Sequence, residues 1–207
     1  MKQKRPAGQM GLWIDGVAIY GPGDGFSHNG LGVWNRNAIF WERLAFDSCS
    51  GHPDGSSIYH LHQNPNCLYD YKNSNSHSPL IGYAFDGFPI YGPFGYSSAN
   101  DNKSPVKLMV SSYKVRSISE RTSLSNGTVL SSYYYGPTIN STYPLGSYME
   151  DYEFVNGYGD LDLYNGRNCV TPEYPSGTYA YFVTLDSSFT AQFPYIIGPY
   201  YYGKILF

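Results

Sequence analysis

Apolar residues occur along this chain in short runs interrupted by Gly, Pro, Asn and Asp, a pattern typical of strands joined by turns. The periodicity of an amphipathic helix is hard to find, and residues 36–46 could form either a short helix or a strand. Strands are predicted at Leu12–Ile14, Val17–Tyr20, Ser57–His62, Ile81–Phe85, Tyr179–Leu185 and Tyr195–Ile197. We therefore expect an all-β or mainly β fold, sandwich-like or barrel-like, with long loops and at most short helices.

A chain of 207 residues is long enough to bury a core as one domain. We expect residues 13–207 to form a single β domain after a lead-in of residues 1–12. The stretch 97–143 is rich in Ser, Asn and Thr, and we interpret it as a long, partly ordered polar insertion with a strand around Lys107–Tyr113. No apolar run is long enough to cross a bilayer, so no membrane span is expected.

One segment of the chain is repeated. Asp15–Pro22 reads DGVAIYGP, and Asp86–Pro93 reads DGFPIYGP. Asp-Gly favours a turn and Gly-Pro ends a strand, so the repeat predicts two equivalent hairpins that a pseudo-twofold axis could relate. Turn chemistry explains this pattern by itself; a functional interpretation would make Asp15 and Asp86 matching carboxylates at a site.

The composition narrows the choice of partners. The formal net charge is −3 and charged residues are 14% of the chain, so there is no basic stripe to neutralise phosphates, and nucleic acid is not an expected partner. The 23 Tyr and 23 Gly favour strands and tight turns. Tyr also suits binding and assembly surfaces, because it combines an apolar ring with a hydroxyl that can face water.

Three cysteines, Cys49, Cys67 and Cys169, allow three pairings. The two nearest, Cys49 and Cys67, bracket three of the histidines, and closing a loop of that size would contribute roughly 3 kcal/mol. We expect that disulfide, with Cys169 unpaired or bonded to another chain. The alternative is three reduced, buried cysteines.

Asn102, Asn126 and Asn140 each begin an Asn-x-Ser/Thr triplet, the acceptor pattern for N-glycosylation. All three triplets fall in the polar stretch 97–143, which fits a surface excursion of an exported protein. We therefore expect an extracellular or cell-surface location.

All five histidines lie within the first 77 residues. On a strand, His60 and His62 would project to the same side and could converge on one ion, with His52 or His77 as a third ligand. Three imidazoles with an open position would suit Zn or Cu, and an added carboxylate such as Asp86 would suit Fe or Mn. The alternative interpretation is that these histidines only bridge loops through hydrogen bonds.

Several blocks of the sequence resemble the YHYH domain family, from about residue 13 to residue 203. The blocks are Phe46–Pro53, Tyr59–His62, Asn64–Leu68, His77–Pro93, Asn165–Arg167, Val170–Pro175, Gly177–Phe182 and Pro194–Gly198. The resemblance implies an exported or extracellular protein and no particular activity. Leu61 replaces the second aromatic of the family's motif, and Asp162–Arg167 reads DLYNGR where the family suggests DECNGR, which argues against a catalytic role there.

Two functions are consistent with these observations. The first is a metal-binding extracellular domain in which His52, His60, His62 and His77 hold Cu or Zn, with Asp86 as a base if the protein were an enzyme. We leave the enzymatic question open and lean towards no activity. The second is a structural or adhesive subunit of a cell-surface or viral filament, which would assemble with identical or related chains through Tyr-rich faces. Glycans are a weaker third class of partner.

Overall fold

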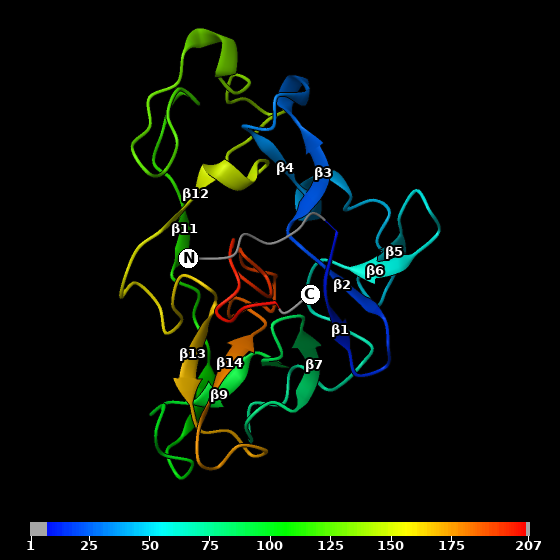
Figure 1. Cartoon of the computed structure of the whole chain (residues 1–207), viewed down its shortest axis with the longest axis vertical. Coiled ribbons are helices and arrows are strands. Elements are labelled where there is room, and N and C mark those ends of the chain that lie inside the picture. The colour runs from blue at the N-terminus through cyan, green and yellow to red at the C-terminus, as the bar shows by residue number, and fades with distance from the viewer. Residues whose placement is uncertain (1–7, 206–207) are drawn as a thin grey trace.

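The computed structural model describes residues 8–205 and is mainly β, as the sequence predicts (Figure 1). The strands are β1 Gln9–Trp13, β2 Ala18–Tyr20, β3 Gly23–Ser27, β4 Asn35–Asn37, β5 Gly51–Pro53, β6 Tyr59–Leu61, β7 Leu80–Ala84, β8 Pro89–Tyr91, β9 Phe94–Tyr96, β10 Val106–Leu108, β11 Tyr113–Val115, β12 Tyr152–Phe154, β13 Gly166–Cys169 and β14 Thr178–Phe182. The helices are α1 Ala38–Trp41 and the 3-10 turns η1 His28–Gly30, η2 Ser132–Tyr134 and η3 Met149–Asp151. Long loops and short helices are therefore both confirmed.

Eight strands form one sheet in the order β13-β14-β8-β7-β1-β2-β6-β5, which runs from the lower left to the right of Figure 1. The first strand already begins at Gln9, inside the segment that was expected to be a lead-in. Three two-stranded ribbons, β3–β4, β9–β10 and β11–β12, flank this sheet.

The sheet consists of two equivalent four-stranded units. In the first unit β1 and β2 form an antiparallel hairpin, β2 pairs with β6 in parallel, and β6 pairs with β5 antiparallel. In the second unit β7, β8, β14 and β13 repeat the same three pairings in the same order. The units meet where β1 and β7 pair antiparallel, which is the relation expected from a pseudo-twofold axis.

The repeated sequence explains the two central hairpins. Gly16 and Gly87 have φ values of +87° and +86°, which glycine adopts without the steric cost that a Cβ would add. Their N–H groups donate to Trp13 and Ala84, in each case over 2.9 Å. The predicted pair of equivalent hairpins is therefore confirmed.

The main core lies where the sheet packs on the C-terminal part of the chain, which is red at the centre of Figure 1. Ile19, Ile81 and Ile90 are fully buried there together with Ile196. The prediction of a strand at Tyr195–Ile197 is wrong: this segment is a turn, and Tyr195 has a φ of +72°. The prediction failed because a short apolar segment that is buried in a turn has the same composition as a buried strand.

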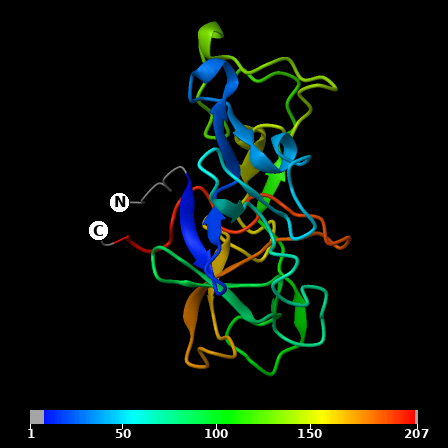
Figure 2. The same cartoon turned by 90° about the vertical axis from the view of Figure 1, so that its right-hand side faces the viewer.

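The later part of the insertion at 97–143, which carries η2, lies beside β3 and β4 in the upper half of the molecule, whereas its first part pairs as β10 with β9 in the lower half (Figure 1 and Figure 2). Arg121 is at its centre, 2% exposed, and forms a two-point ion pair with Asp151 at 2.7 and 2.8 Å. The predicted strand at Lys107–Tyr113 is divided between β10 and β11, because Ser111 and Ser112 turn inward and donate to buried carbonyls.

Candidate metal centre

Three of the predicted histidines are held together by the β5–β6 hairpin of the first unit. His52 of β5 lies directly opposite His60 of β6, and His62 follows immediately after β6. Because side chains two residues apart share a side of a strand, His60 and His62 point the same way, as predicted. Leu61 lies between these two histidines in the sequence, but its side chain is buried in the hydrophobic core.

The turn before β5 orients the hairpin. Asp47 accepts hydrogen bonds from the backbone of Cys49 and Gly51 and from the Tyr59 hydroxyl, at 2.9, 3.1 and 2.7 Å. Burial and this last bond raise the pKa of Tyr59 to about 12. The disulfide between Cys49 and Cys67, predicted from their spacing, is present and closes the loop that carries the histidines.

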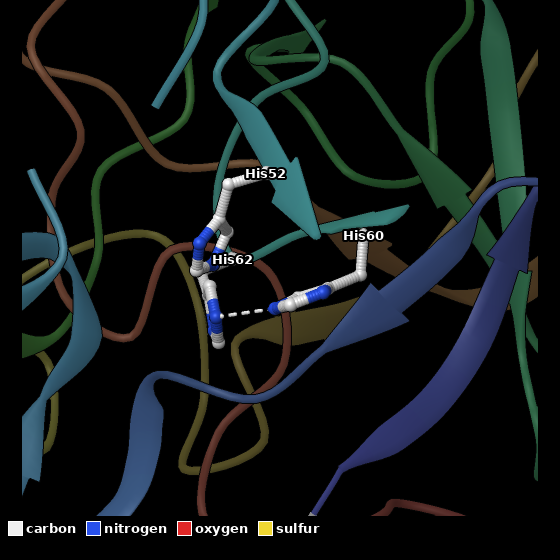
Figure 3. Close-up of side chains that lie close together, drawn as sticks. All are labelled: His52, His60 and His62. Atoms are coloured by element: carbon white, nitrogen blue, oxygen red, sulfur yellow. Dashed lines mark hydrogen bonds between the residues drawn. The ribbon is translucent and has the colours of Figure 1, made fainter. Parts of the chain in front are cut away.

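The three imidazoles form one compact cluster (Figure 3). One ligand atom from each of His52, His60 and His62 lies within 4.8 Å of the others. Among residues 8–205, these three form the one group of three or more His, Cys, Asp or Glu side chains that are close enough to hold a metal ion. The Nε2 atoms of His60 and His62 are 3.0 Å apart. The exposed fractions of the three side chains are 6, 2 and 2%, so all three rings are buried.

Backbone contacts determine which ring nitrogens carry protons. Nδ1 of His60 is 3.0 Å from the carbonyl of Ile58, and Nδ1 of His62 is 2.5 Å from the carbonyl of Gly21. A carbonyl only accepts, so each Nδ1 must be the donor and, in a neutral ring, each Nε2 has a lone pair. Two lone pairs facing each other over 3.0 Å repel, unless a proton or a metal ion lies between them.

Burial favours the unprotonated form of two of the rings, His52 and His60. Burial lowers the pKa of His52 and of His60 from the usual value near 6.5, and the neighbouring His62 lowers both further. Carboxylates near the cluster act in the opposite direction and do not reverse the shift. Neutral imidazole is the form that binds metals.

Glu42 is a fourth group at this site that the sequence did not indicate. Its Oε2 is 3.1 Å from Nε2 of His62 and 3.4 Å from Nε2 of His52. Burial alone would raise the pKa of Glu42, but its contacts with the histidines hold it below its usual value. The residue follows α1 in a mixed apolar segment, where no local pattern marks an acid as functional.

A cavity of about 440 Å³ opens beside the cluster. Tyr20, Asp24, Phe26, Trp41 and Glu42 line it together with the three histidines. Tyr20 stacks on His60 with ring centroids 3.8 Å apart, which restrains the orientation of that imidazole. The cavity is of a size that accommodates one small ligand next to the cluster.

The other two predicted ligands lie elsewhere, in the second unit. Nδ1 of His77 faces the carbonyl of Ser78, and its ring packs among Tyr91, Tyr96 and Phe182. Asp86 occupies the β7–β8 turn, where it accepts hydrogen bonds from the Tyr181 hydroxyl and the backbone of Gly203. The sequence suggested these two residues by their type and position, but the structure does not bring them together with the three histidines.

The second unit has no histidine cluster at the equivalent position. When β13–β14 is aligned with β5–β6 by strand pairing, Arg167, Ala180 and Phe182 take the positions of His52, His60 and His62. The Arg167 guanidinium lies over the Phe182 ring, 5.5 Å from its centroid. The second unit therefore has the same strand pairing as the first, but the Arg167 guanidinium takes the place of an imidazole.

The glycosylation triplets and the third cysteine differ in exposure. Asn102, Asn126 and Asn140 are all exposed. Cys169 is free and buried, which raises the pKa of its thiol. Within the described part of the chain, no helix has the length and apolar character needed to span a membrane.

Comparison with known proteins identifies one family. The family model described as YHYH protein matches residues 1–194, which is most of the chain. Searches of curated proteins and of solved structures find no match. The eponymous motif corresponds to Tyr59–His62, that is, to β6 and the histidine that follows it.

Proposed function

The chain belongs to the YHYH protein family, and on this premise we propose that it is an extracellular metal-binding protein that holds Cu or Zn through His52, His60 and His62. One observation carries the proposal: the Nε2 atoms of His60 and His62 face each other over 3.0 Å while both Nδ1 atoms are committed to carbonyls. A shared cation makes this arrangement favourable.

The donor set supports these two metals. Neutral imidazole nitrogen is a ligand that Zn and Cu share, and second contacts such as those to Ile58 and Gly21 are the kind that fix the tautomer of a metal-binding histidine. Among residues 8–205, no Cys belongs to the cluster, which disfavours a thiolate-type site. The extracellular location is supported by the disulfide and by the exposure of the three glycan acceptor triplets.

Titration of the metal-free protein with Zn²⁺ and with Cu²⁺ tests this proposal. We expect one strong site per chain, lost in the double variant His60→Ala/His62→Ala and retained in His77→Ala, which removes a buried imidazole from the other unit. Absence of a strong site in the wild-type protein would contradict the proposal. The cluster would then be a set of hydrogen-bonded rings that share a proton.

A second function is favoured by a specific observation. Tyr133, Tyr134 and Tyr135 are 69, 42 and 39% exposed around η2, the yellow-green coil at the top of Figure 1. Such a group suits assembly with identical or related chains as a structural or adhesive subunit. Light scattering on the wild type and on Tyr133→Ser/Tyr135→Ser tests it: assembly that the variant loses supports this function, and a monomer at all concentrations contradicts it.

A further inference from the structure

We propose that Glu42 is the fourth ligand of the metal, so that the site is three imidazoles and one carboxylate; this rests on the proposed function. The side chain approaches the histidines from a different part of the chain. The histidines belong to the β5–β6 hairpin, whereas Glu42 comes directly after α1.

Three of the distances between the donor atoms match those around a single small ion. Bonds of 2.0–2.1 Å in a tetrahedral site place neighbouring ligand atoms roughly 3.3 Å apart. The separations here are 3.0 Å between Nε2 of His60 and of His62, 3.1 Å from Oε2 of Glu42 to Nε2 of His62, and 3.4 Å from the same oxygen to Nε2 of His52. Three edges of the expected tetrahedron are therefore present.

Hydrogen bonding does not account for the position of this oxygen. Oε2 of Glu42 and Nε2 of His52 are both buried and 3.4 Å apart, and no hydrogen bond of good geometry reaches either atom. The nearest atom to Oε2 in the cluster is Nε2 of His62, at 3.1 Å, and it could donate only if that ring carried two protons, because Nδ1 already donates to the carbonyl of Gly21. A cation shared with the imidazoles would give both buried atoms a partner.

The backbone presents Glu42 rigidly. Its N–H donates to the carbonyl of Ala38 and so closes the single turn of α1. At the start of that turn, Asn37 is fixed by the carbonyl of Gly146 and the hydroxyl of Tyr195, and the Trp41 indole donates to the carbonyl of Ser147. The carboxylate therefore reaches the cluster without a flexible loop, as a metal ligand requires.

Asp24, the other buried acid at the cavity, is already neutralised. Its Oδ2 lies 2.7 Å from Nε of Arg36, and its Oδ1 accepts from the backbone of Phe26. Asp24 is therefore the matched control for Glu42: it lies in the same cavity and has the same charge, but it makes no contact with the cluster that would complete a coordination shell.

The side chain of Glu42 is 25% exposed, whereas those of the three imidazoles are 2–6% exposed. Glu42 also lines the cavity. Glu42 is therefore the most exposed of the four groups at the site.

Zn²⁺ titration of the wild type, Glu42→Gln and Asp24→Asn, together with visible spectra of the Co²⁺-loaded proteins, tests the assignment. Glu42→Gln should raise the Zn²⁺ Kd at least about tenfold and change the Co²⁺ spectrum. Asp24→Asn should leave the spectrum unchanged and the Kd within about threefold, because its charge is already paired.

Unfolding of the three metal-free proteins shows whether Glu42→Gln still folds. We expect a single cooperative unfolding transition, as in the wild type, because Gln has the same size and shape as Glu. Wild-type Kd and spectrum in a folded Glu42→Gln would overturn the assignment and leave the three-histidine site intact. Failure of the wild type itself to bind Zn²⁺ or Co²⁺ would overturn the proposed function instead.

Discussion

Gly51 is the residue whose missing side chain matters most for the geometry of the histidine hairpin. A Cβ at this position would overlap the ring of Tyr59, whose hydroxyl holds Asp47 in place. We expect Gly51→Ala to lower the free energy of unfolding by about 1–3 kcal/mol, as overpacking of a tight site does. Denaturant unfolding measures this, with Gly55→Ala as the control.

Gly55 lies on the same hairpin but has open space where its Cβ would be. Its substitution should therefore change stability by no more than about 0.5 kcal/mol. Equal effects of the two variants would show that contact with Tyr59 does not restrict Gly51.

Glu150 should give the protein a stability that depends on pH. Burial raises its pKa to about 7, although Asn35 donates to both carboxylate oxygens. The unfolded chain ionises this group near pH 4.5 while the folded chain keeps the proton, so stability is lost as pH rises from about 4.5 through 7. His52 and His60, whose pKa values are lowered, act in the opposite direction below pH 6.5.

Comparison with Glu150→Gln isolates the Glu150 effect. We expect the unfolding free energy of the variant, relative to the wild type, to increase by roughly 2–3 kcal/mol between pH 5 and pH 8. A difference between the two proteins that stays constant with pH would mean that Glu150 ionises at its ordinary pKa.

Individual residues of the cluster could be predicted from the sequence only where local spacing determines their position. His60 and His62 share a side because they are two apart on a strand, and His52 joins them because the hairpin is short. Glu42 comes to the cluster through the packing of α1, which leaves no periodic signal. His77 and Asp86 follow the three histidines in the sequence and have side chains that can bind metals, but they lie in the second unit.

At the scale of elements, the disulfide is the main constraint on the site. Cys49 and Cys67 are 18 residues apart and enclose all three histidines. We expect Cys49→Ser/Cys67→Ser to lower the unfolding free energy by about 3 kcal/mol and to weaken metal binding, because the unfolded loop gains conformational freedom. Cys169→Ala, which removes the buried free thiol, should leave metal affinity unchanged in the same titration.

Element positions were predictable where turn residues and alternation agreed. The two Asp-Gly hairpins were correct, and so was the strand that carries His60. The C-terminal apolar run and the segment at 107–113 were misassigned, since both are determined by long-range contacts. The second segment is interrupted by two serines whose hydroxyls donate to buried carbonyls. In the sequence, serines at these positions look like the polar residues of an exposed strand.

At the scale of the whole molecule, the two units share more than the repeated hairpins. Asp162 accepts hydrogen bonds from Tyr164, Gly166 and the Tyr179 hydroxyl. Asp47 makes the corresponding set in the first unit, with Cys49, Gly51 and Tyr59. In the sequence, the two sets share only the spacing Asp-x-x-x-Gly, and this short pattern is too weak to predict that the two turns are equivalent.

We expect Asp47→Ala and Asp162→Ala to be similarly destabilising, by about 1–3 kcal/mol each, because they remove the same bonds. Only Asp47→Ala should also weaken Zn²⁺ binding, since only the first unit has the histidines. Equal losses of Zn²⁺ affinity in both variants would place the metal elsewhere than in the β5–β6 hairpin.

The most direct test of the central claim is the metal content of the purified, untagged protein, measured by elemental mass spectrometry beside His60→Ala/His62→Ala. We predict about one Cu or Zn per chain in the wild type. The double variant should contain almost none while remaining folded. Metal-free wild-type protein that also takes up none from buffer, or equal metal in both proteins, would contradict a metal site at these histidines.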